Sequence, residues 1–582
     1  MRAARQAARA GQILLHREGP AWHPKQGPPF TGFPKDLPQG ERLRVTDQQT
    51  ADCIPVTHLP GATRLYLDYC ADRGRIRSFY SSLPWDGRWQ RRPTLPPHWP
   101  EVARLIADQN PGPAAAKNVA ALLAGAGTIA TGQQVALFGG PLFTPLKMAT
   151  AVARARQATA SGTPHVPVFW LAAEDHDFAE INHVLFPARR GMERLEYTAA
   201  PGAQRPVGEL VLDESILPLV DRAQQILGAS PAGDALADAY RPGKTLGQAF
   251  AEFYARIFAA QGLLMLDASG RDFHRLGAPV LRQAIERADE FHTELLERDA
   301  ALQAAGYHVQ VAVLERSSLL FLIDRQTGAR MALKRTRPSA AEPDGIWQAG
   351  NTLFTTADLL GILEAEPERI SPSALLRPVF QDYLLSTSLL VAGPAEIAYF
   401  AQSEVLYREI LGRQTTAEPR LSATLIEPHV AELMTKHGLT LDQVFRVDEL
   451  SLGKMLADQA MPAAGRQRLD AAGKALDAEI EALVGWMRAQ DEGLGKSAET
   501  AAGKMQYQMS RLRAIAENFQ LQKEASLAKH AQAIATALCP GGVRQERVHA
   551  AAYYFGRYGV ELAERLCALA EKQCPGHAAL RL

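Results

Sequence analysis

The sequence is poor in cysteine and has no net charge, and both facts limit what the protein can be. Its 582 residues include five cysteines, which form no Cys-x-x-Cys pair and leave a gap from Ala71 to Leu538. An odd number of widely spaced cysteines argues against a disulfide framework or a zinc ribbon, and it favours a reducing cytoplasm. Lysine plus arginine and aspartate plus glutamate both total 63, so the formal net charge is zero. A large nucleic-acid footprint needs a basic surplus, so no nucleic-acid partner is expected.

Long apolar runs are also missing. No window approaches the roughly 18 uninterrupted apolar residues of a membrane-spanning helix, so we expect no membrane segment. Residues 1–51 are basic and then rich in proline and glycine, and they lack the apolar core of a signal peptide. We expect them to form a flexible extension. The rest of the chain is long enough for about two to four domains.

Short apolar strands alternate with helical segments over much of the chain. Strand units are predicted within 128–147, 166–173, 262–270 and 383–392, and in each of them an apolar strand runs into glycine or into clustered polar residues. Helices are predicted over 65–83, over 101–123 with a break near 110–113, over 245–260 and over about 279–303. This alternation is typical of a doubly wound α/β sheet, which binds ligands at the carboxyl ends of its strands. An enzyme is therefore the leading interpretation.

Two segments have other periods. From Tyr307 to Arg335 the apolar residues alternate around the turn 325–328, which predicts an inserted antiparallel hairpin whose first strand includes the valines at 309, 311 and 313. Leu469, Leu476 and Leu483 lie seven residues apart, and after a break at 493–495 a 4-3 spacing resumes from Met505. This pattern predicts an antiparallel coiled coil whose leucines form a core or a dimer seam.

A glycine-rich turn follows the first strand unit. Gly132 and the pair Gly139 and Gly140 would let the backbone approach a ligand, and the next helix would point its first amides at a phosphate. Lys147 could place its charge against that phosphate. Further hydrogen-bond donors in this stretch are Gln133, Gln134 and Thr144. The alternative is a tight turn in which glycine serves packing only, since the spacing matches neither the Walker A pattern nor the dinucleotide fingerprint.

The densest group of titratable residues follows the second strand unit. It contains Glu174, Asp175, His176, Asp177, Glu180, Asn182 and His183. Carboxylates beside imidazoles can perform general acid–base chemistry or bind a metal, but no metal-ligand set is complete locally. The alternative is that Asp177 and Glu180 form a capping box at the start of a helix.

A third group surrounds the last strand unit. Gly393 and Glu396 follow the strand, and Arg377, Gln381 and Asp382 precede it. Arg377 could bind a carboxylate or a phosphate through two hydrogen bonds. A structural ion pair of Arg377 with Asp382 or Glu396 is the alternative.

These residues carry a resemblance. The stretches 131–144, 167–183 with its Glu-Asp-His-Asp element, 377–378, 393–397 and 545–559 resemble the family of cysteine-adding enzymes of bacillithiol biosynthesis, over nearly all of the chain after the extension. The resemblance implies a Rossmann-type core related to class I aminoacyl-tRNA synthetases. It also implies inserted connective-peptide modules and a C-terminal coiled coil that supports a homodimer.

The resemblance further implies a reaction, the addition of L-cysteine to glucosaminyl malate to form an amide. It implies ATP, with Mg²⁺, as the activator of the carboxylate, although no literal HIGH or KMSKS signature is present. The turn at Gly139 and Gly140 would then hold phosphates with Lys147, and His176 or Asp177, beside Asp175, would act as base or orient the acyl group. Other interpretations are a different amide-forming or nucleotidyl-transferring enzyme on this fold, or a nucleotide-binding scaffold protein of the pathway.

Together these patterns predict a division of the chain. The expected parts are an extension (1–51), the first part of the core (52–190), an inserted subdomain (191–244), more of the core (245–304), an inserted hairpin module (305–372), the last part of the core (373–460) and a helical coiled-coil arm (461–582).

Overall fold

A sheet of five parallel strands lies at the centre of the computed structural model, which describes residues 53–91, 94–188, 191–198, 205–335 and 345–582. The extension predicted over 1–51 lies outside the described residues. The strand order is β13-β12-β2-β3-β6. The bounds are β2 (Gly127–Gln134), β3 (His165–Ala172), β6 (Leu264–Leu266), β12 (Leu389–Ala392) and β13 (Thr416–Pro419). Successive strands therefore run outward from β2 in one direction and then from β12 in the other, which is the Rossmann order with its switch point between β2 and β12.

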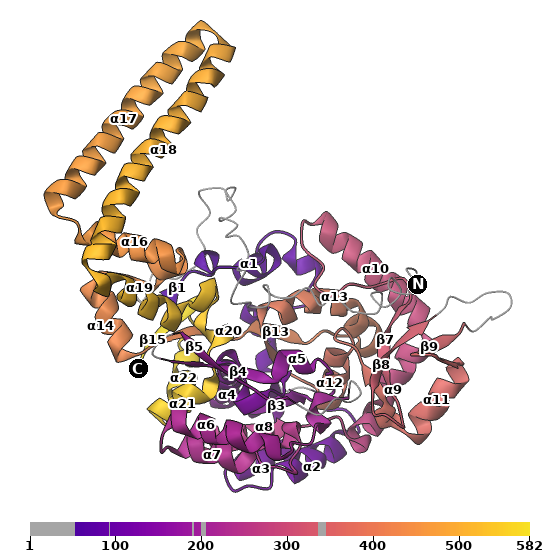
Figure 1. Ribbon diagram of the computed structural model, residues 1–582. Coiled ribbons are helices and arrows are strands. Elements are labelled where there is room, and N and C mark those ends of the chain that lie inside the picture. Colours follow the sequence, from indigo (N-terminus) through magenta and orange to yellow (C-terminus); the bar gives the residue numbers. More distant parts are fainter. Residues whose placement is uncertain (1–52, 92–93, 189–190, 199–204, 336–344) are drawn as a thin grey trace, which may run out of the picture. The chain divides into compact units, whose positions relative to one another are not determined.

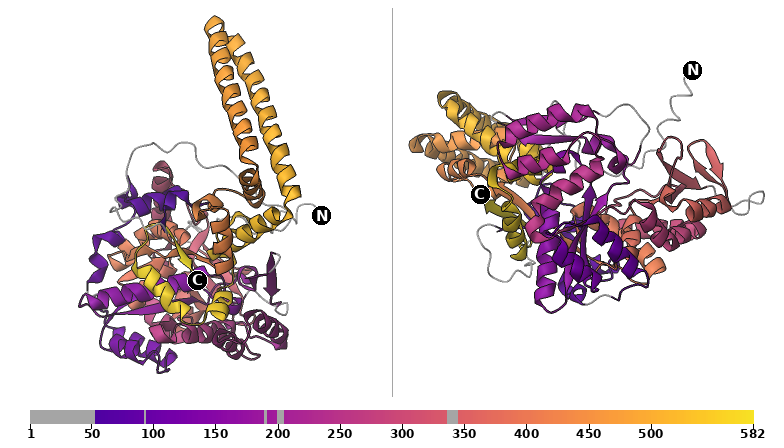
Figure 2. Two further views of the ribbon diagram at one scale, coloured as in Figure 1. Left: turned by 90° about the vertical axis from the view of Figure 1, so that its left-hand side faces the viewer. Right: turned by 90° about the horizontal axis from the view of Figure 1, so that it is seen from below.

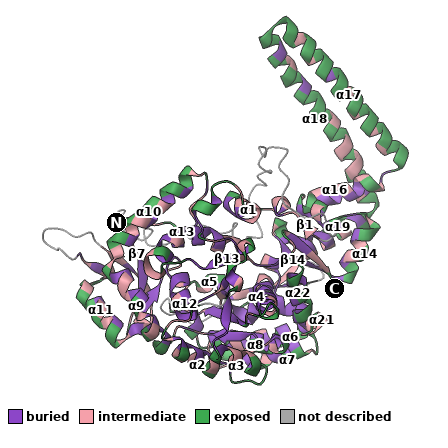
Figure 3. Ribbon diagram, turned by 180° about the vertical axis from the view of Figure 1, so that it is seen from behind, coloured by how far each residue is buried: buried purple, intermediate pink, exposed green. Residues whose placement is uncertain are grey.

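Burial explains why these strands read as apolar runs. Most residues of β2 and β3 and all of β12 are buried, as expected when helices cover both faces of a parallel sheet (Figures 1 and 3). Ala130 in β2 pairs with Val168 of β3 on one side and with Leu390 of β12 on the other.

The chain forms two compact units. The helices of the first unit, which holds the sheet, are α1 (Arg64–Ala71), α2 (Trp99–Gln109), α3 (Ala116–Leu123), α4 (Phe143–Ala160), α5 (Phe178–Ile181), α6 (Leu217–Leu227), α7 (Pro231–Ala239), α8 (Leu246–Ile257), α9 (Arg271–Glu286), α10 (Ala288–Ala304), α11 (Thr356–Ala365), α12 (Arg377–Leu385), α13 (Pro394–Leu411), α20 (Gln545–Val548), α21 (Ala551–Tyr558) and α22 (Leu562–Glu571). Besides the central sheet and a second five-stranded sheet, the chain has the strands β1 (Cys53–Ile54), β4 (His183–Pro187), β5 (Met192–Glu196), β14 (Ser422–Ile426) and β15 (His577–Arg581).

Several helix predictions are confirmed and two need correction. The helix at 245–260 is α8, which Thr245 and Gln248 begin with a capping box. The helix predicted over 65–83 ends at Ala71, because Asp72 takes a left-handed conformation with φ of 50°. The helix predicted over 279–303 is two helices, α9 and α10, and Pro279 lies inside α9.

The inserted hairpin grows into a second sheet. The strands β7 (Ser317–Ile323) and β8 (Arg330–Arg335) flank the predicted turn and join β9 (Trp347–Ala349), β10 (Thr352–Phe354) and β11 (Ile370–Pro372) in the antiparallel order β10-β9-β8-β7-β11. The valines at 309, 311 and 313 are not in a strand, so that part of the prediction is wrong. Likewise, the residues from Tyr383 to Leu385 end helix α12, and the strand begins only at Leu389.

The two ends of the described chain meet within the first unit. Strand β1 pairs antiparallel with β15, and Cys53 forms a disulfide with Cys574, 521 residues later. The other three cysteines, Cys70, Cys539 and Cys567, are free. The structure therefore holds one disulfide and no larger framework among the described residues. The spacing of the cysteines could not reveal this pair, because only the tertiary fold brings its members together.

The second unit contains the predicted helical hairpin. Its helices are α14 (Pro428–Lys436), α15 (Leu441–Phe445), α16 (Glu449–Ala460), α17 (Ala463–Gln490), α18 (Glu492–Lys523) and α19 (Ala525–Leu538). Helices α17 and α18 lie side by side along their length (Figures 1 and 2). The turn falls at Asp491, whose side chain caps α18, so the predicted break at 493–495 lies inside the first turn of that helix. None of the helices in the described part of the chain has both the length and the apolarity that crossing a membrane requires.

Candidate active site

A buried ion pair connects the helices on the two sides of the switch point of the sheet. Lys147 of α4 extends to Glu396 of α13, and its Nζ also donates to the carbonyl oxygen of Gly132 at 2.8 Å and to Oε1 of Gln133 at 3.0 Å. Glu396 in turn accepts from the backbone N–H of Gly393 at 2.7 Å. Burial lowers the pKa of Lys147 and outweighs the attraction of the carboxylate. Because an ammonium group has three donors, Lys147 already uses all of them within the protein.

The glycine turn is packed from the side of α8. Gly139 and Gly140 have φ values of 81° and 70°, which suit glycine. The N–H of Gly139 donates to the hydroxyl of Tyr240 at 2.9 Å, and the hydroxyl of Tyr254 donates to the carbonyl of Gly139 at 2.7 Å. A Cβ atom on Gly139 would lie 2.8 Å from the ring of Phe253. The packing alternative therefore accounts for both glycines.

The start of helix α4 is covered by the C-terminal segment of the same unit. The N–H of Leu142 donates to the carbonyl of His549 at 2.9 Å, and the N–H of Ala551 donates to the carbonyl of Gly140 at 3.0 Å. Thr144 is buried, and its hydroxyl has no hydrogen-bond partner among the described residues. Phosphate binding by this turn stays a prediction, and these contacts do not support it.

A polar cluster does form where β2 and β3 end. Gln134 donates through Nε2 to Asp175 and, at 3.3 Å, to Glu180. The other oxygen of Asp175 accepts from the N–H of His176 at 2.7 Å. Burial would raise the pKa of Asp175, but the hydrogen bond from Gln134 and the charge of Arg330 outweigh it and lower that pKa. Asp175 is therefore a carboxylate at neutral pH.

His176 and Asp177 are the next two residues of the cluster, and both are at least partly exposed. The side chain of His176 is 31% exposed, and burial together with the charge of Arg330 lowers its pKa. Asp177 is exposed and precedes α5, yet its side chain makes no capping hydrogen bond there. The capping-box alternative for Asp177 and Glu180 is therefore wrong.

Behind this cluster lies a buried pair that the sequence did not reveal. His274, in the first turn of α9, places Nε2 3.2 Å from Oε1 of Glu174 and Nδ1 3.1 Å from the carbonyl oxygen of Ile370. Burial opposes both charges, but their mutual attraction prevails: the pKa of His274 is raised and the pKa of Glu174 is lowered. His274 follows the third predicted strand unit, so the rule that located the other groups could also have located this one.

The second residue missed by the sequence is Arg330 of strand β8. Its guanidinium group lies 3.7 Å above the ring of Phe321 and is fixed by Ser371 and Pro372 of β11. Its Nη1 lies 3.4 Å from Nδ1 of His176. No local signal distinguishes this arginine, because only the folding of the inserted sheet brings it to the core.

Arg377 extends from helix α12 toward the same region. Its Nη2 donates to the hydroxyl of Tyr399 at 2.8 Å. Among the described residues, no carboxylate lies within ion-pair distance of Arg377, because Asp382 pairs with Arg413 at 3.0 Å and Glu396 pairs with Lys147. The structural ion pair considered for Arg377 is therefore wrong. Gln381, on the same helix, is buried.

Asn182 and His183 belong to a different neighbourhood. Asn182 donates to the carbonyl of Tyr197 at 3.2 Å and to Glu196 at 3.3 Å, and Nδ1 of His183 lies 3.2 Å from Oδ1 of Asn182. These contacts hold the segment after β5 against the start of β4.

A possible metal site lies elsewhere. Among the described residues, the one group of three potential ligands close enough to share a metal ion is Glu290, Glu294 and Glu409 on α10 and α13. Arg287 and Arg408 form ion pairs with these three acids.

These observations define an α/β protein with Rossmann strand order and a cluster of carboxylate, imidazole and guanidinium groups at the strand ends. Two family models cover nearly the whole chain: the N-terminal Rossmann-like domain of bacillithiol biosynthesis BshC matches residues 50–420, and the C-terminal coiled-coil domain of BshC matches residues 423–582. The chain belongs to the BshC family of bacillithiol biosynthesis.

Individual relatives agree with this assignment. A protein of Koribacter versatilis is 37% identical over 540 residues, which cover 91% of this chain and 99% of the relative. Proteins of Solibacter usitatus and Salinibacter ruber are 35% and 30% identical, and the matches cover 98% and 96% of those relatives. All three carry the name "Putative cysteine ligase BshC".

Proposed function

We propose that this protein is an amide-forming ligase that joins the carboxyl group of L-cysteine to the amine of glucosaminyl malate. The observation that carries the proposal is the full-length match to relatives named as cysteine ligases, combined with the cluster at the strand ends. In the reaction the C–N bond forms and one carboxylate oxygen leaves with the phosphate group that activated it, while the ammonium group of the sugar loses two protons and keeps one N–H in the amide.

The charges of the cluster suit these substrates. Arg377 has a guanidinium group without a carboxylate partner among the described residues, so it is the group we assign to a substrate carboxylate. The carboxylate of Asp175 can hold the incoming amine and accept a proton from it. The buried pair of Glu174 and His274 connects the end of β3 with the start of α9 and so fixes the backbone beside Asp175.

We propose ATP, with Mg²⁺, as the source of activation, because a free carboxylate lacks a good leaving group and ATP supplies one. The glycine turn does not fit this role in its present contacts, since its N–H groups are already bonded inside the protein.

The test is incubation of the purified full-length protein with L-cysteine, glucosaminyl malate, ATP and Mg²⁺, with detection of the thiol product by mass. We expect the product with wild-type protein and a raised KM for glucosaminyl malate or cysteine in Arg377→Gln. Arg408→Gln, an exposed arginine on α13, is the matched control. Absence of product with any nucleotide refutes the ligase, whereas release of ADP instead of AMP refutes only an adenylate intermediate.

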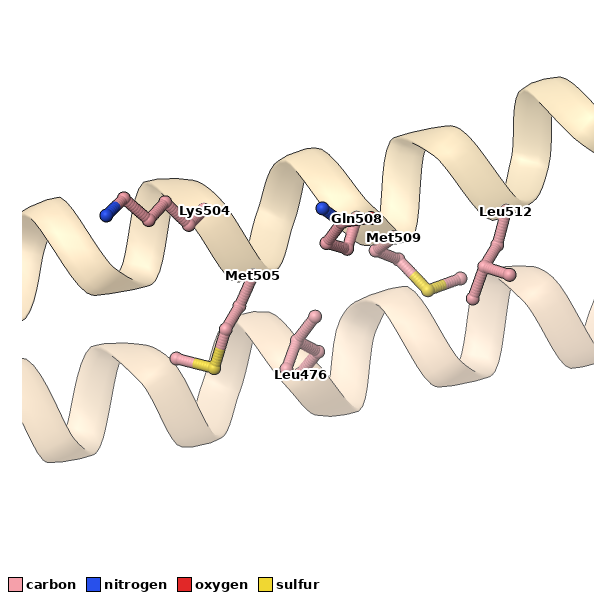
Figure 4. Close-up of a pocket in the computed structure, with 6 residues that line it drawn as sticks. All are labelled: Leu476, Lys504, Met505, Gln508, Met509 and Leu512. Atoms are coloured by element: carbon pink, nitrogen blue, oxygen red, sulfur yellow. The ribbon is translucent and has the colours of Figure 1, made fainter.

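We also propose that the protein is a homodimer joined through the helical hairpin. Helix α18 exposes an apolar stripe at helical spacing, which consists of Met505, Leu512, Ile515 and Phe519, and helix α17 exposes Leu483 and Trp486. Between the helices lies a groove of about 340 Å³, and Figure 4 shows Leu476 of α17 with Met505, Met509 and Leu512 of α18 beside it. Figure 3 shows how few positions of this hairpin are buried. The apolar stripe of α18 and the exposed apolar side chains of α17 match a second copy of the same hairpin.

A further inference from the structure

Arg330 is a buried cation without an ion-pair partner. Its residue is only 8% exposed, and none of the described carboxylates lies within 4.0 Å of its guanidinium nitrogens. Nε donates to the hydroxyl of Ser371 at 3.1 Å, Nη2 donates to the carbonyl of Pro372 at 2.9 Å, and the ring of Phe321 lies beneath the plane. Three strands of the inserted sheet thus hold one orientation of a charge that is costly to bury. Such costs are concentrated at functional sites.

The remaining contact of Arg330 is with His176, at 3.4 Å between Nη1 and Nδ1. A guanidinium group can only donate, so this contact is a hydrogen bond when Nδ1 of His176 offers a lone pair and the imidazole proton is on Nε2. Oδ1 of Asp175 also faces Nδ1, but at 3.7 Å it lies beyond hydrogen-bond distance. His274 shows the opposite arrangement, because its two nitrogens face the carbonyl of Ile370 and the carboxylate of Glu174, which are both acceptors. The two histidines of this site are therefore held in different protonation states.

The charges around His176 agree with this assignment. Burial and the cation of Arg330 lower the pKa of His176, while the neighbouring carboxylates of Asp175 and Asp177 act in the opposite direction and do not prevail. The aromatic ring next to His176 among the described residues is that of Phe321, 6.0 Å away between centroids, and it carries no charge. Nε2 of His176 has no hydrogen-bond partner among the described residues, and the side chain is 31% exposed, so this nitrogen is available to a ligand.

We propose that Arg330 is a positioning residue that holds His176 as a neutral imidazole with its proton on Nε2, so that His176 donates a hydrogen bond to an oxygen of the acyl group and does not act as the general base. The inference rests on the proposed function, because that function supplies the acyl oxygen. A neutral imidazole that donates to an oxygen stabilises the negative charge that develops there during acyl transfer. Removal of the proton from the amine then falls to Asp175, the carboxylate beside it.

The protonation state can be measured without any turnover. We would label the histidines of the full-length protein with ¹⁵N, assign His176 from the signals lost in His176→Gln, and titrate the spectra with pH. We expect a proton on Nε2, none on Nδ1, and titration below the ordinary value of about pH 6.5. In Arg330→Met, His176 should titrate at higher pH, and Arg330→Lys, which retains a cationic donor, should restore the lower value in part.

Arg325→Met is the matched control, because Arg325 lies on the exposed turn of the same hairpin. It should leave the titration of His176 unchanged, and thermal melting should establish that each variant is folded. A proton on Nδ1 in the wild-type protein overturns the proposal. An unchanged titration of His176 in folded Arg330→Met does so as well.

The donor role has its own test in the ligase assay. Glutamine can place an N–H where Nε2 of histidine lies, so His176→Gln should retain most of the activity, whereas His176→Ala should lose about 10²–10³-fold in kcat. Equal loss in the two variants overturns the donor role. If the wild-type protein makes no product at all, the proposed ligase function fails, while the NMR experiment still decides the state of His176.

Discussion

Lys147 and Glu396 form an ion pair that connects the helix after β2 with the helix after β12, across the switch point of the central sheet. Only 3% of the Lys147 side chain and 17% of the Glu396 side chain are exposed. Lys147 therefore supports the strand ends, and the sequence had placed it against a phosphate. The two roles lead to different behaviour in variants.

Substitution of one partner should leave a buried charge unpaired. We expect Lys147→Met to destabilise the protein by about 3–5 kcal/mol, and Lys147→Met combined with Glu396→Gln to be less destabilised than the single variant. Thermal melting of the three proteins tests this expectation. A single variant that melts like wild type but loses nucleotide binding would favour the phosphate role.

The pair of Glu174 and His274 makes stability depend on pH. The pKa of His274 is raised above its unfolded value of about 6.5, so its contribution is complete below that pH and is lost as pH rises through the raised pKa. The pKa of Glu174 is lowered below its unfolded value of about 4.3, so its contribution is complete above that pH and is lost as pH falls. The stabilisation should therefore be greatest near about pH 5–6.

We expect the difference in Tm between wild type and His274→Gln to be largest in that range and to shrink at alkaline pH. Glutamine can still donate to Glu174 but carries no charge. Calorimetry of both proteins from acid to alkaline pH provides the measurement. A difference that is constant across the range contradicts the assignment of an imidazolium at His274.

Gly139 and Gly162 form a matched pair for the packing of the glycine turn. Both have positive φ, 81° and 89°, but a Cβ on Gly162 meets nothing within 4 Å, whereas a Cβ on Gly139 would lie 2.8 Å from the ring of Phe253. Gly162→Ala should cost about 1–2 kcal/mol for its backbone conformation alone. Gly139→Ala should cost about 1–3 kcal/mol more, because it also overpacks the core. Denaturant unfolding measures both free energies. If the two variants lose the same free energy of unfolding, the core can make room for the added methyl group at Gly139 and the packing explanation is wrong.

The disulfide between Cys53 and Cys574 should respond to reductant. We expect dithiothreitol to lower the Tm of the oxidised wild-type protein, because reduction of the disulfide should remove about 2–5 kcal/mol from the free energy of unfolding. Cys574→Ser should melt at the lower temperature and be insensitive to dithiothreitol. A wild-type protein whose melting ignores the reductant would show that this bond does not form or does not matter for stability.

The proposed dimer depends on the apolar stripe of the hairpin. Leu512→Glu together with Phe519→Glu should convert the protein to a monomer in light scattering, because charges would then enter the interface. Leu450→Glu on α16 is the control, since Leu450 is also exposed, at 65%, but lies outside the hairpin. A dimer that survives the double substitution refutes this interface.

Periodicity was a reliable guide where an element buries one continuous face. It predicted helix α8 and the α17–α18 hairpin, because the apolar residues of such helices recur at helical spacing whatever lies opposite. It failed at the valines of 309–313, where the structure has a single bridge residue, Val311, and no strand. Strands in a sheet need neighbours, and neighbours are a property of the fold.

The same limit applies to the site. The rule that parallel strands present ligand-binding groups at their carboxyl ends located Gln134, Asp175 and His176 from the sequence, whereas Arg377 precedes its strand and was located by its charge. It could not separate those residues from Asn182, whose side chain connects the start of β4 with the end of β5, or from His183, whose ring contacts Asn182.

The sequence by itself therefore determined the class of fold, the coiled-coil hairpin, the family and the stretch that supplies the acids and imidazoles. These features depend on the spacing of residues that are close together in the chain. Only the tertiary structure decided that the glycine turn packs against helix α8, that Lys147 pairs with Glu396 and that Arg330 contacts His176. Those three relationships join residues from separate elements, and long-range packing alone sets the distances between them.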